Sequence, residues 1–136
     1  MIMANRVASL MRADPKLVTT ANRQYLERLL EQEGINNCST AERLRRLNEA
    51  AGALGITCPE NRSAKGSSLY LFFLQLLHTM RRALLIEELE LTENTRVILK
   101  NGLGSGPIRR ITDTLYLEIP GQEMPWSPAM VERVVR

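Results

Sequence analysis

The apolar stretch from Leu69 to Leu91 constrains the fold of this chain more than any other feature. Apolar residues surround nearly all of its first half and occupy one side of its second half. This pattern is typical of a helix that begins inside a hydrophobic core and ends at its surface. We therefore expect it to form the central helix of the protein. Four charged residues should face outward near its end: Arg81, Arg82, Glu87 and Glu88.

Two earlier segments also have apolar residues at helical spacing, with helix-ending residues at their boundaries. The first follows Asp14-Pro15, and its pattern stops at Gly34, a residue type common just after a helix. Either Ser39 or Thr40 can cap the start of the second, which stops at Gly55. The sequence therefore predicts two amphipathic helices before the central one.

Residues 57–68 lie between the second and the central helix and are rich in turn formers, so we expect an exposed connection there. Near the other end of the chain, Ser127 stands before a proline. A cap residue followed by proline in the first turn is a common helix start. We therefore expect a last short helix from this point.

Residues 96–119 fit two kinds of secondary structure. The run from 97 to 99 fits either a short helix or a strand, because β-branched residues favour strands. Pro107 stands where a further helix would begin, but the apolar residues of 115–119 alternate as in a strand, which would pair with 96–100 as a hairpin. We favour the helices. The predicted fold is then mainly α, a compact bundle of five or six short helices, and a hairpin would make it α+β.

The length and composition favour one domain over residues 1–136. With 136 residues, of which 44% are hydrophobic, the chain is long enough for one core and short for two ordinary domains. Residues 1–14 are expected to be either frayed or docked on this core. The run from Leu69 to Leu77 is broken by Gln75 and is shorter than the roughly 18 residues that cross a bilayer. We therefore predict no membrane contact.

Chemistry at a metal or catalytic centre is not indicated. The two cysteines, Cys38 and Cys58, form no CxxC motif, so we expect neither zinc nor a disulfide, and a cytoplasmic location fits free thiols. The single histidine, His78, has no nucleophile or carboxylate grouped with it by any motif. The glycines of residues 102–106 lack the strand and the acidic partner of a dinucleotide site. We therefore predict a protein that is not an enzyme and that needs no cofactor.

Arginine doublets on the predicted helices suggest a binding function instead. An ordered row of guanidinium groups suits the phosphates of nucleic acids, and the net charge of the chain is +3. We expect a DNA-binding transcription regulator in which three arginines approach a groove while three further basic residues hold phosphates. The groove residues are Arg43, Arg45 and Arg46, and the phosphate residues are Lys65, Arg109 and Arg110.

Several segments are similar to a known family. They are Leu99-Lys100-Asn101-Gly102-Leu103, Gly106, Ile111, Leu115-Tyr116-Leu117-Glu118, Arg43-Leu44-Arg45-Arg46-Leu47 and Lys65-Gly66. With gaps, they resemble parts of the FlhC-type flagellar master transcriptional activators. The resemblance covers about residues 28–118 and implies a mostly helical subunit that pairs with another regulator subunit and binds promoter DNA. The four-cysteine zinc cluster of that family is absent here, which puts zinc binding and its DNA contacts in doubt.

The alternative function is that of an adaptor or assembly subunit. An exposed side of the central helix, or the segment with Met124 and Trp126, would then fill a groove of a protein partner. The single tryptophan would be the anchor. Self-association or a partner subunit is expected in either case, because so apolar a helix leaves surface to cover.

Overall fold

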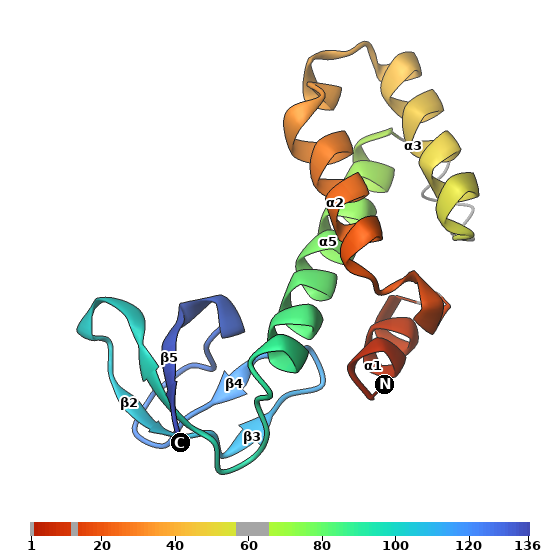
Figure 1. The fold of residues 1–136 in the computed structure, drawn as a ribbon. Helices are drawn as coiled ribbons and strands as arrows, with labels where there is room; N and C mark the ends of the chain where they lie inside the picture. Colours follow the sequence, from red (N-terminus) through yellow and green to blue (C-terminus); the bar gives the residue numbers. More distant parts are fainter. Residues whose placement is uncertain (1, 12–13, 57–65) are drawn as a thin grey trace. The chain divides into compact units, whose positions relative to one another are not determined.

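The structure, a computed structural model, describes residues 2–11, 14–56 and 66–136. The chain divides into two compact units, Met1–Met80 and Arg81–Arg136. We call the first the helical unit and the second the strand unit. Helix α5 (Gly66–Glu88) contributes residues to both (Figure 1).

The helical unit contains three helices besides its part of α5. They are α1 (Ile2–Met11), α2 (Thr20–Glu27) and α3 (Thr40–Leu54), and α2 continues into a π-helical turn, Arg28–Gln32. Short 3₁₀ turns precede and follow α2, at Pro15–Leu17 and Ile35–Asn37.

The ends of these helices follow from local residue chemistry. The structure confirms the predicted cap at Ser39 and the predicted ends at Gly34 and Gly55, whereas the cap at Thr19 was not predicted, since the first helix was expected directly after Pro15. The hydroxyl groups of Thr19 and Ser39 accept hydrogen bonds from backbone N–H groups of the first turns of α2 and α3, at 3.1 and 3.2 Å. Such caps satisfy donors that have no partner within the helix. Gly34 and Gly55 follow the helical segments with φ of 65° and 70°, a conformation that costs glycine little.

Helix α5 confirms the predicted central helix, although it begins earlier than expected. Residues 66–68, predicted as part of a connection, belong to the helix, and the rest of that predicted connection, 57–65, lies outside the described residues. Phe73, Leu76 and Leu77 are fully buried, and the ring of Phe72 meets that of Phe73 edge to face at 5.7 Å. Burying each such side chain stabilises the fold by about 1.5–3 kcal/mol. The helix therefore forms a large part of the core.

The same helix has the composition of a membrane span. Among the described helices, α5 alone has such a segment, Leu69–Glu88, with a mean hydropathy of 1.3. Half of that segment is buried within the fold. The absence of membrane contact stays a prediction.

The strand unit consists of two small antiparallel sheets. In the first, β1 (Arg96–Leu99) lies between β2 (Ser105–Pro107) and β5 (Val131–Val135), and in the second, β3 (Arg110–Ile111) pairs with β4 (Leu117–Glu118). Two 3₁₀ turns, Lys100–Gly102 and Pro128–Met130, precede β2 and β5. Figure 1 shows these elements in cyan and blue.

The prediction of helices over residues 96–119 is therefore wrong, whereas the mainly helical character is confirmed, since the described part of the chain is 57% helical. The fold is α+β. Val97 and Leu99 are buried while Arg96 is exposed, as expected for a strand whose side chains point alternately to opposite faces, and the β-branched Val97 and Ile98 favour this conformation. The hairpin alternative was correct in kind, but 117–118 pairs with 110–111 and not with 96–100.

The last predicted helix is a single 3₁₀ turn that leads into a strand. The Ser127 hydroxyl accepts a hydrogen bond from the backbone N–H of Ala129 at 3.2 Å, so the predicted cap is present. The chain then extends because Val131, Val134 and Val135 favour a strand, and β5 pairs with β1.

The β3–β4 turn holds a residue in an unusual conformation. Leu115 has φ of 67°, a region that most side chains avoid, and is fully buried. Its backbone N–H donates to the carbonyl of Thr112 at 2.9 Å, and the hydroxyl of Thr112 accepts from the backbone N–H of Tyr116 at 3.0 Å. Packing and local hydrogen bonds together hold this turn in place.

Candidate functional site

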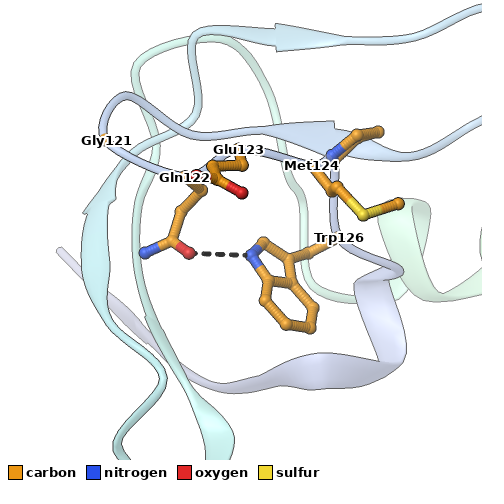
Figure 2. A pocket seen from close by; sticks show the side chains of 6 residues that line it. Gly121, Gln122, Glu123, Met124 and Trp126 are labelled. Carbon is orange, nitrogen blue, oxygen red and sulfur yellow. Dashed lines mark hydrogen bonds between the residues drawn. The ribbon is translucent and has the colours of Figure 1, made fainter.

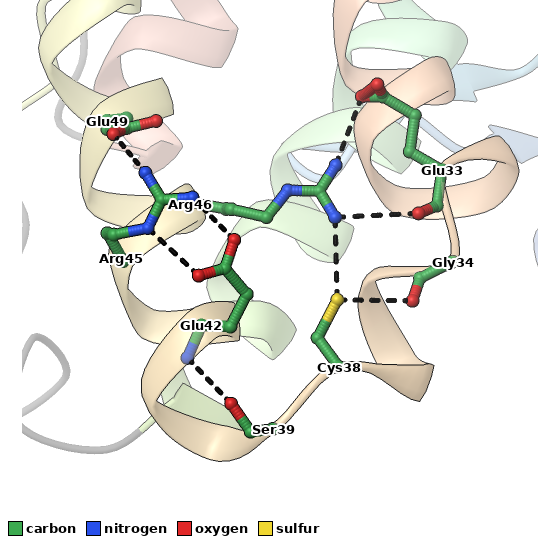
Figure 3. A network of polar contacts seen from close by, with 8 residues as sticks. All are labelled: Glu33, Gly34, Cys38, Ser39, Glu42, Arg45, Arg46 and Glu49. Carbon is green, nitrogen blue, oxygen red and sulfur yellow. Dashed lines mark hydrogen bonds and ion pairs between the residues drawn. The ribbon is translucent and has the colours of Figure 1, made fainter.

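The arginines predicted to enter a DNA groove lie on or beside one polar network in the helical unit (Figure 3). Arg45 pairs with Glu42 and also with Glu49, whose Oε1 lies 2.6 Å from an Arg45 nitrogen. The hydrogen bond from Arg45 lowers the pKa of Glu42, and the same bond raises the pKa of Arg45. The charge of Arg45 is therefore balanced within α3.

Arg43 and Arg46 bind the turn that precedes α3. Arg43 donates to the carbonyl oxygens of Ile35 and Asn36, at 3.2 and 3.0 Å. Arg46 lies 3.5 Å from the Glu33 carboxylate and also contacts the Glu33 carbonyl and the Cys38 sulfur, each at 3.5 Å (Figure 3). These two side chains hold helix and turn together.

Two of the three basic residues predicted to hold phosphates lie within the described part of the chain. Arg109 and Arg110 lie in the strand unit, and Lys65 lies outside the described residues. Arg110 donates to the carboxylate of Glu118 at 2.7 Å, and this hydrogen bond lowers the pKa of Glu118. Arg109 is exposed and has no ion pair among the residues that the structure describes.

The excess positive charge comes from the first part of the chain. Residues 1–80 contain ten basic and seven acidic residues, whereas residues 81–136 contain eight of each. The strand unit is therefore electrically balanced, which does not favour a polyanion as its ligand.

An apolar hollow lies beside the loop that follows β4 (Figure 2). Its volume is about 460 Å³, within the range of small-ligand sites. We call it the Trp126 pocket, and its lining residues are Gly121, Gln122, Glu123, Met124, Pro125 and Trp126. Trp126 is half-buried, and Met124 is 73% exposed. Sequence reasoning selected these two side chains as partner-binding residues, and the structure places both in one pocket.

A turn and a backbone bridge fix the shape of this loop. The backbone N–H of Gln122 donates to the carbonyl of Ile119 at 3.1 Å, and Pro120 and Gly121 occupy the corner, with Gly121 at φ of 86°. Trp126 and Leu117 exchange backbone hydrogen bonds at 2.7 and 2.8 Å. The tryptophan is thus anchored to β4 through its main chain.

Gln122 joins this loop to the β1–β2 loop. Its Nε2 donates to the carbonyl of Leu103 at 3.2 Å, and its Oε1 accepts from the Trp126 indole N–H at 3.3 Å (Figure 2). A Cβ on Gly104 would lie 2.5 Å from the Gln122 Nε2, so the glycine makes room for the amide. Both ends of the Gln122 side chain are therefore engaged.

Sequence reasoning did not identify Gln122 or Leu103 as part of this region. Leu103 is 41% exposed, so both loops that Gln122 connects carry an exposed apolar side chain, the other being Met124. The pair of glycines at 104 and 106 was considered in the sequence only as part of a dinucleotide site, which its surroundings do not fit. Its spacing is a signal of close backbone approach, but the partner of that approach is 18 residues away in sequence, and no local pattern reveals it.

A smaller hollow of about 180 Å³ adjoins the same loop. It shares Gly121 to Pro125 with the Trp126 pocket and adds Arg109, Glu118, Ile119 and Pro120, so we call it the Arg109 hollow. Three of its lining residues are ionisable: Arg109, Glu118 and Glu123.

The described residues contain no group of three or more His, Cys, Asp or Glu side chains arranged to hold a metal ion. The sulfur of Cys38 donates to the carbonyl of Gly34 at 3.6 Å, and Cys58 lies outside the described residues. His78 is exposed. The absence of enzymatic activity and the absence of a cofactor both stay predictions.

No protein-family model matches the chain, no curated protein matches its sequence, and no solved structure matches its fold. Similarity to the FlhC-type activators is therefore an expectation from the sequence alone. Residues 99–103 and 115–118, which carry much of this resemblance to a mostly helical subunit, lie on strands and turns here.

Proposed function

We propose that the protein is a non-enzymatic adaptor or assembly subunit, and that its strand unit binds a segment of a protein partner in the Trp126 pocket. One observation carries this proposal: an apolar hollow lined by the half-buried single tryptophan and by a methionine that is 73% exposed. Tryptophan and methionine are enriched at protein interfaces, and tryptophan often dominates their binding energy.

The loops around the pocket are suited to this task. The side chain of Met124 is apolar and exposed to water. Covering it with a partner's apolar side chain is favourable by about 25 cal/mol for each Å² of apolar surface removed from solvent. The backbone bridge of Trp126 to Leu117 and its bond to Gln122 fix the ring before a partner arrives. Such preorganisation lowers the entropic cost of binding.

Duplex DNA is the second candidate, as the sequence suggested. In its favour, residues 1–80 carry the excess positive charge and Arg109 is exposed. The ion pairs of Arg45, Arg46 and Arg110 count against it, because each would have to be exchanged for a phosphate. If phosphates anchor the complex, affinity for duplex DNA falls steeply with salt, by about 0.9 logarithmic units per contact per logarithmic unit of salt. A flat response favours the adaptor.

The adaptor proposal is tested by selecting ligands for the pocket. A library of random dodecapeptides displayed on phage is panned against the full chain, and the enriched peptides are synthesised. Because Trp126 is the only tryptophan, its fluorescence reports directly on the pocket. We expect an enriched peptide to shift the emission to the blue as the ring loses contact with water.

Substitutions at Met124 complete the test. Met124→Gln keeps the length of the side chain but adds a polar amide, so we expect peptide affinity to fall about tenfold, whereas Met124→Leu retains it. Leu71→Gln is the matched control, since Leu71 is 56% exposed but lies in the helical unit. Failure to enrich any peptide, or peptides that bind Met124→Gln equally and leave the emission unchanged, would overturn the proposal.

A further inference from the structure

We propose that the partner segment carries a lysine or arginine next to the apolar side chain that fills the Trp126 pocket. This inference rests on the proposed function and specifies its ligand. It follows from the charges and hydrogen bonds around the pocket.

Glu123 supplies the first argument. It is the only ionisable residue among the six that line the Trp126 pocket, and its side chain is exposed. Within the described part of the chain it makes no ion pair or side-chain hydrogen bond. Its carboxylate is therefore available to a ligand that already has an apolar group in the pocket.

The neighbouring carboxylate is committed elsewhere. Glu118 lines the Arg109 hollow and accepts a hydrogen bond from Arg110 at 2.7 Å. A cation on the ligand would have to displace this arginine to pair with Glu118, whereas Glu123 needs no displacement. The negative charge that a ligand meets is thus at Glu123.

The indole of Trp126 supplies an independent argument. Its N–H already donates to Gln122 at 3.3 Å, so the ring has no hydrogen-bond donor to offer a carboxylate or carbonyl of the ligand. The face of a tryptophan ring attracts lysine and arginine side chains through its quadrupole. Both the ring and Glu123 therefore favour a cation over an anion.

Arg109 limits where that cation lies. It lines the Arg109 hollow but not the Trp126 pocket, and it is close enough to Glu118 to contribute to the lowered pKa of that carboxyl group. A ligand cation is repelled from this hollow. Because Glu123 lines both the Arg109 hollow and the Trp126 pocket, the cation should reach it from the Trp126 pocket, beside the apolar anchor.

The composition of the selected peptides tests this inference. The library is panned in parallel against the full native chain, against Glu123→Gln and against Glu123→Lys. On the native chain we expect peptides with lysine or arginine within two positions of a leucine, methionine or aromatic residue. The basic position should be lost on Glu123→Gln and replaced by aspartate or glutamate on Glu123→Lys.

The affinity of one enriched peptide for the native chain and for the variants measures how much Glu123 contributes to binding. An exposed ion pair contributes modestly, so Glu123→Gln should weaken that peptide about two- to fivefold, and the difference should disappear at high salt. Circular dichroism checks that the variants fold, which is expected for an exposed residue. Peptides that are apolar without a basic residue, or that are acidic, would overturn this inference and leave the adaptor function standing. Absence of any selected peptide would overturn both.

Discussion

At the scale of single residues, Gln122 determines how the pocket is held. Its amide nitrogen donates to the Leu103 carbonyl, and its amide oxygen accepts from the indole of Trp126. Rotating the amide by 180° would therefore break both hydrogen bonds. A glutamine whose two ends are fixed in this way holds the ring in place from within the lining of the pocket.

Gln122→Ala should therefore release the tryptophan. We expect the emission of Trp126 to shift to the red and its quenching by acrylamide to increase, with a loss of stability of about 1 kcal/mol. Gln122→Glu is the matched variant: it retains an acceptor for the indole but cannot donate to the Leu103 carbonyl at neutral pH. An emission spectrum unchanged by Gln122→Ala would show that the backbone bridge to Leu117 alone holds the ring.

Residue types in the sequence predicted two of the residues that line the Trp126 pocket. The single tryptophan beside Met124 and Pro125 led to Met124 and Trp126 as predicted partner-binding residues, and both line the Trp126 pocket. The arginines were misleading, because a charge pattern does not show whether a carboxylate lies one helical turn away or across a turn. Glu42 and Glu49 stand at such spacings from Arg45, so these pairs were readable, whereas the contact between Arg46 and Glu33 depends on the path of the turn.

At the scale of elements, the arginines of α3 divide into structural and surface groups. Arg43→Met should destabilise the helical unit by about 1 kcal/mol, because two carbonyl oxygens of the preceding turn lose their donor. Arg45→Met should leave the unfolding midpoint nearly unchanged, since its ion pairs are exposed. Thermal unfolding followed by circular dichroism distinguishes the two variants. Equal losses would mean that the surface ion pairs stabilise more than exposed pairs usually do.

The β3–β4 hairpin should respond to acid. The pKa of Glu118 is lowered by its hydrogen bond with Arg110, so the folded state binds a proton at this group less readily than the unfolded chain. The stabilising effect is complete above the ordinary glutamate pKa of about 4.3 and is lost as the pH falls through the lower value in the folded state. Urea unfolding of the native chain, followed by Trp126 fluorescence, should show a steeper loss of stability between pH 5 and 3 than Glu118→Gln. If the stabilities of the native chain and of Glu118→Gln fell in parallel with pH, the bond between Glu118 and Arg110 would not be the cause of the acid sensitivity.

Helices were more predictable than strands because their signals are local. Caps at Ser39 and glycines at 34 and 55 define helix ends within a few residues, and the structure confirms them. The strands depend on partners far along the chain, since β1 pairs with β5 more than thirty residues later. Period-two alternation over four or five residues does not by itself outweigh a competing helical spacing.

At the scale of the whole molecule, α5 connects the stability of the two units. Phe73 and Leu76, in the part of this helix that belongs to the helical unit, are buried, and so are Ala83 and Ile86, in the part that belongs to the strand unit. Because helix formation is cooperative along the chain, loss of one core removes support from the helix that serves the other. We therefore keep the single-domain prediction from the sequence as a proposal, and it implies that the two units unfold together.

We therefore expect one transition in urea. Circular dichroism, dominated by the helices, and the fluorescence of Trp126, which lies in the strand unit, should give coincident curves. The variants Met124→Gln and Glu123→Gln serve as controls, because exposed substitutions should shift neither curve. Two separated midpoints would mean that the units fold independently, and the single-domain prediction would then be wrong.

Leu115 imposes conflicting requirements at one position. Its backbone has the left-handed φ of 67° that glycine and asparagine tolerate best, while its side chain fills a fully enclosed part of the core. Glycine would relax the main chain and leave a void, asparagine would bring an amide into an apolar space, and a β-branched replacement would worsen the dihedral. None of the twenty amino acids meets both demands, so this corner of the hairpin is a compromise with little room for substitution.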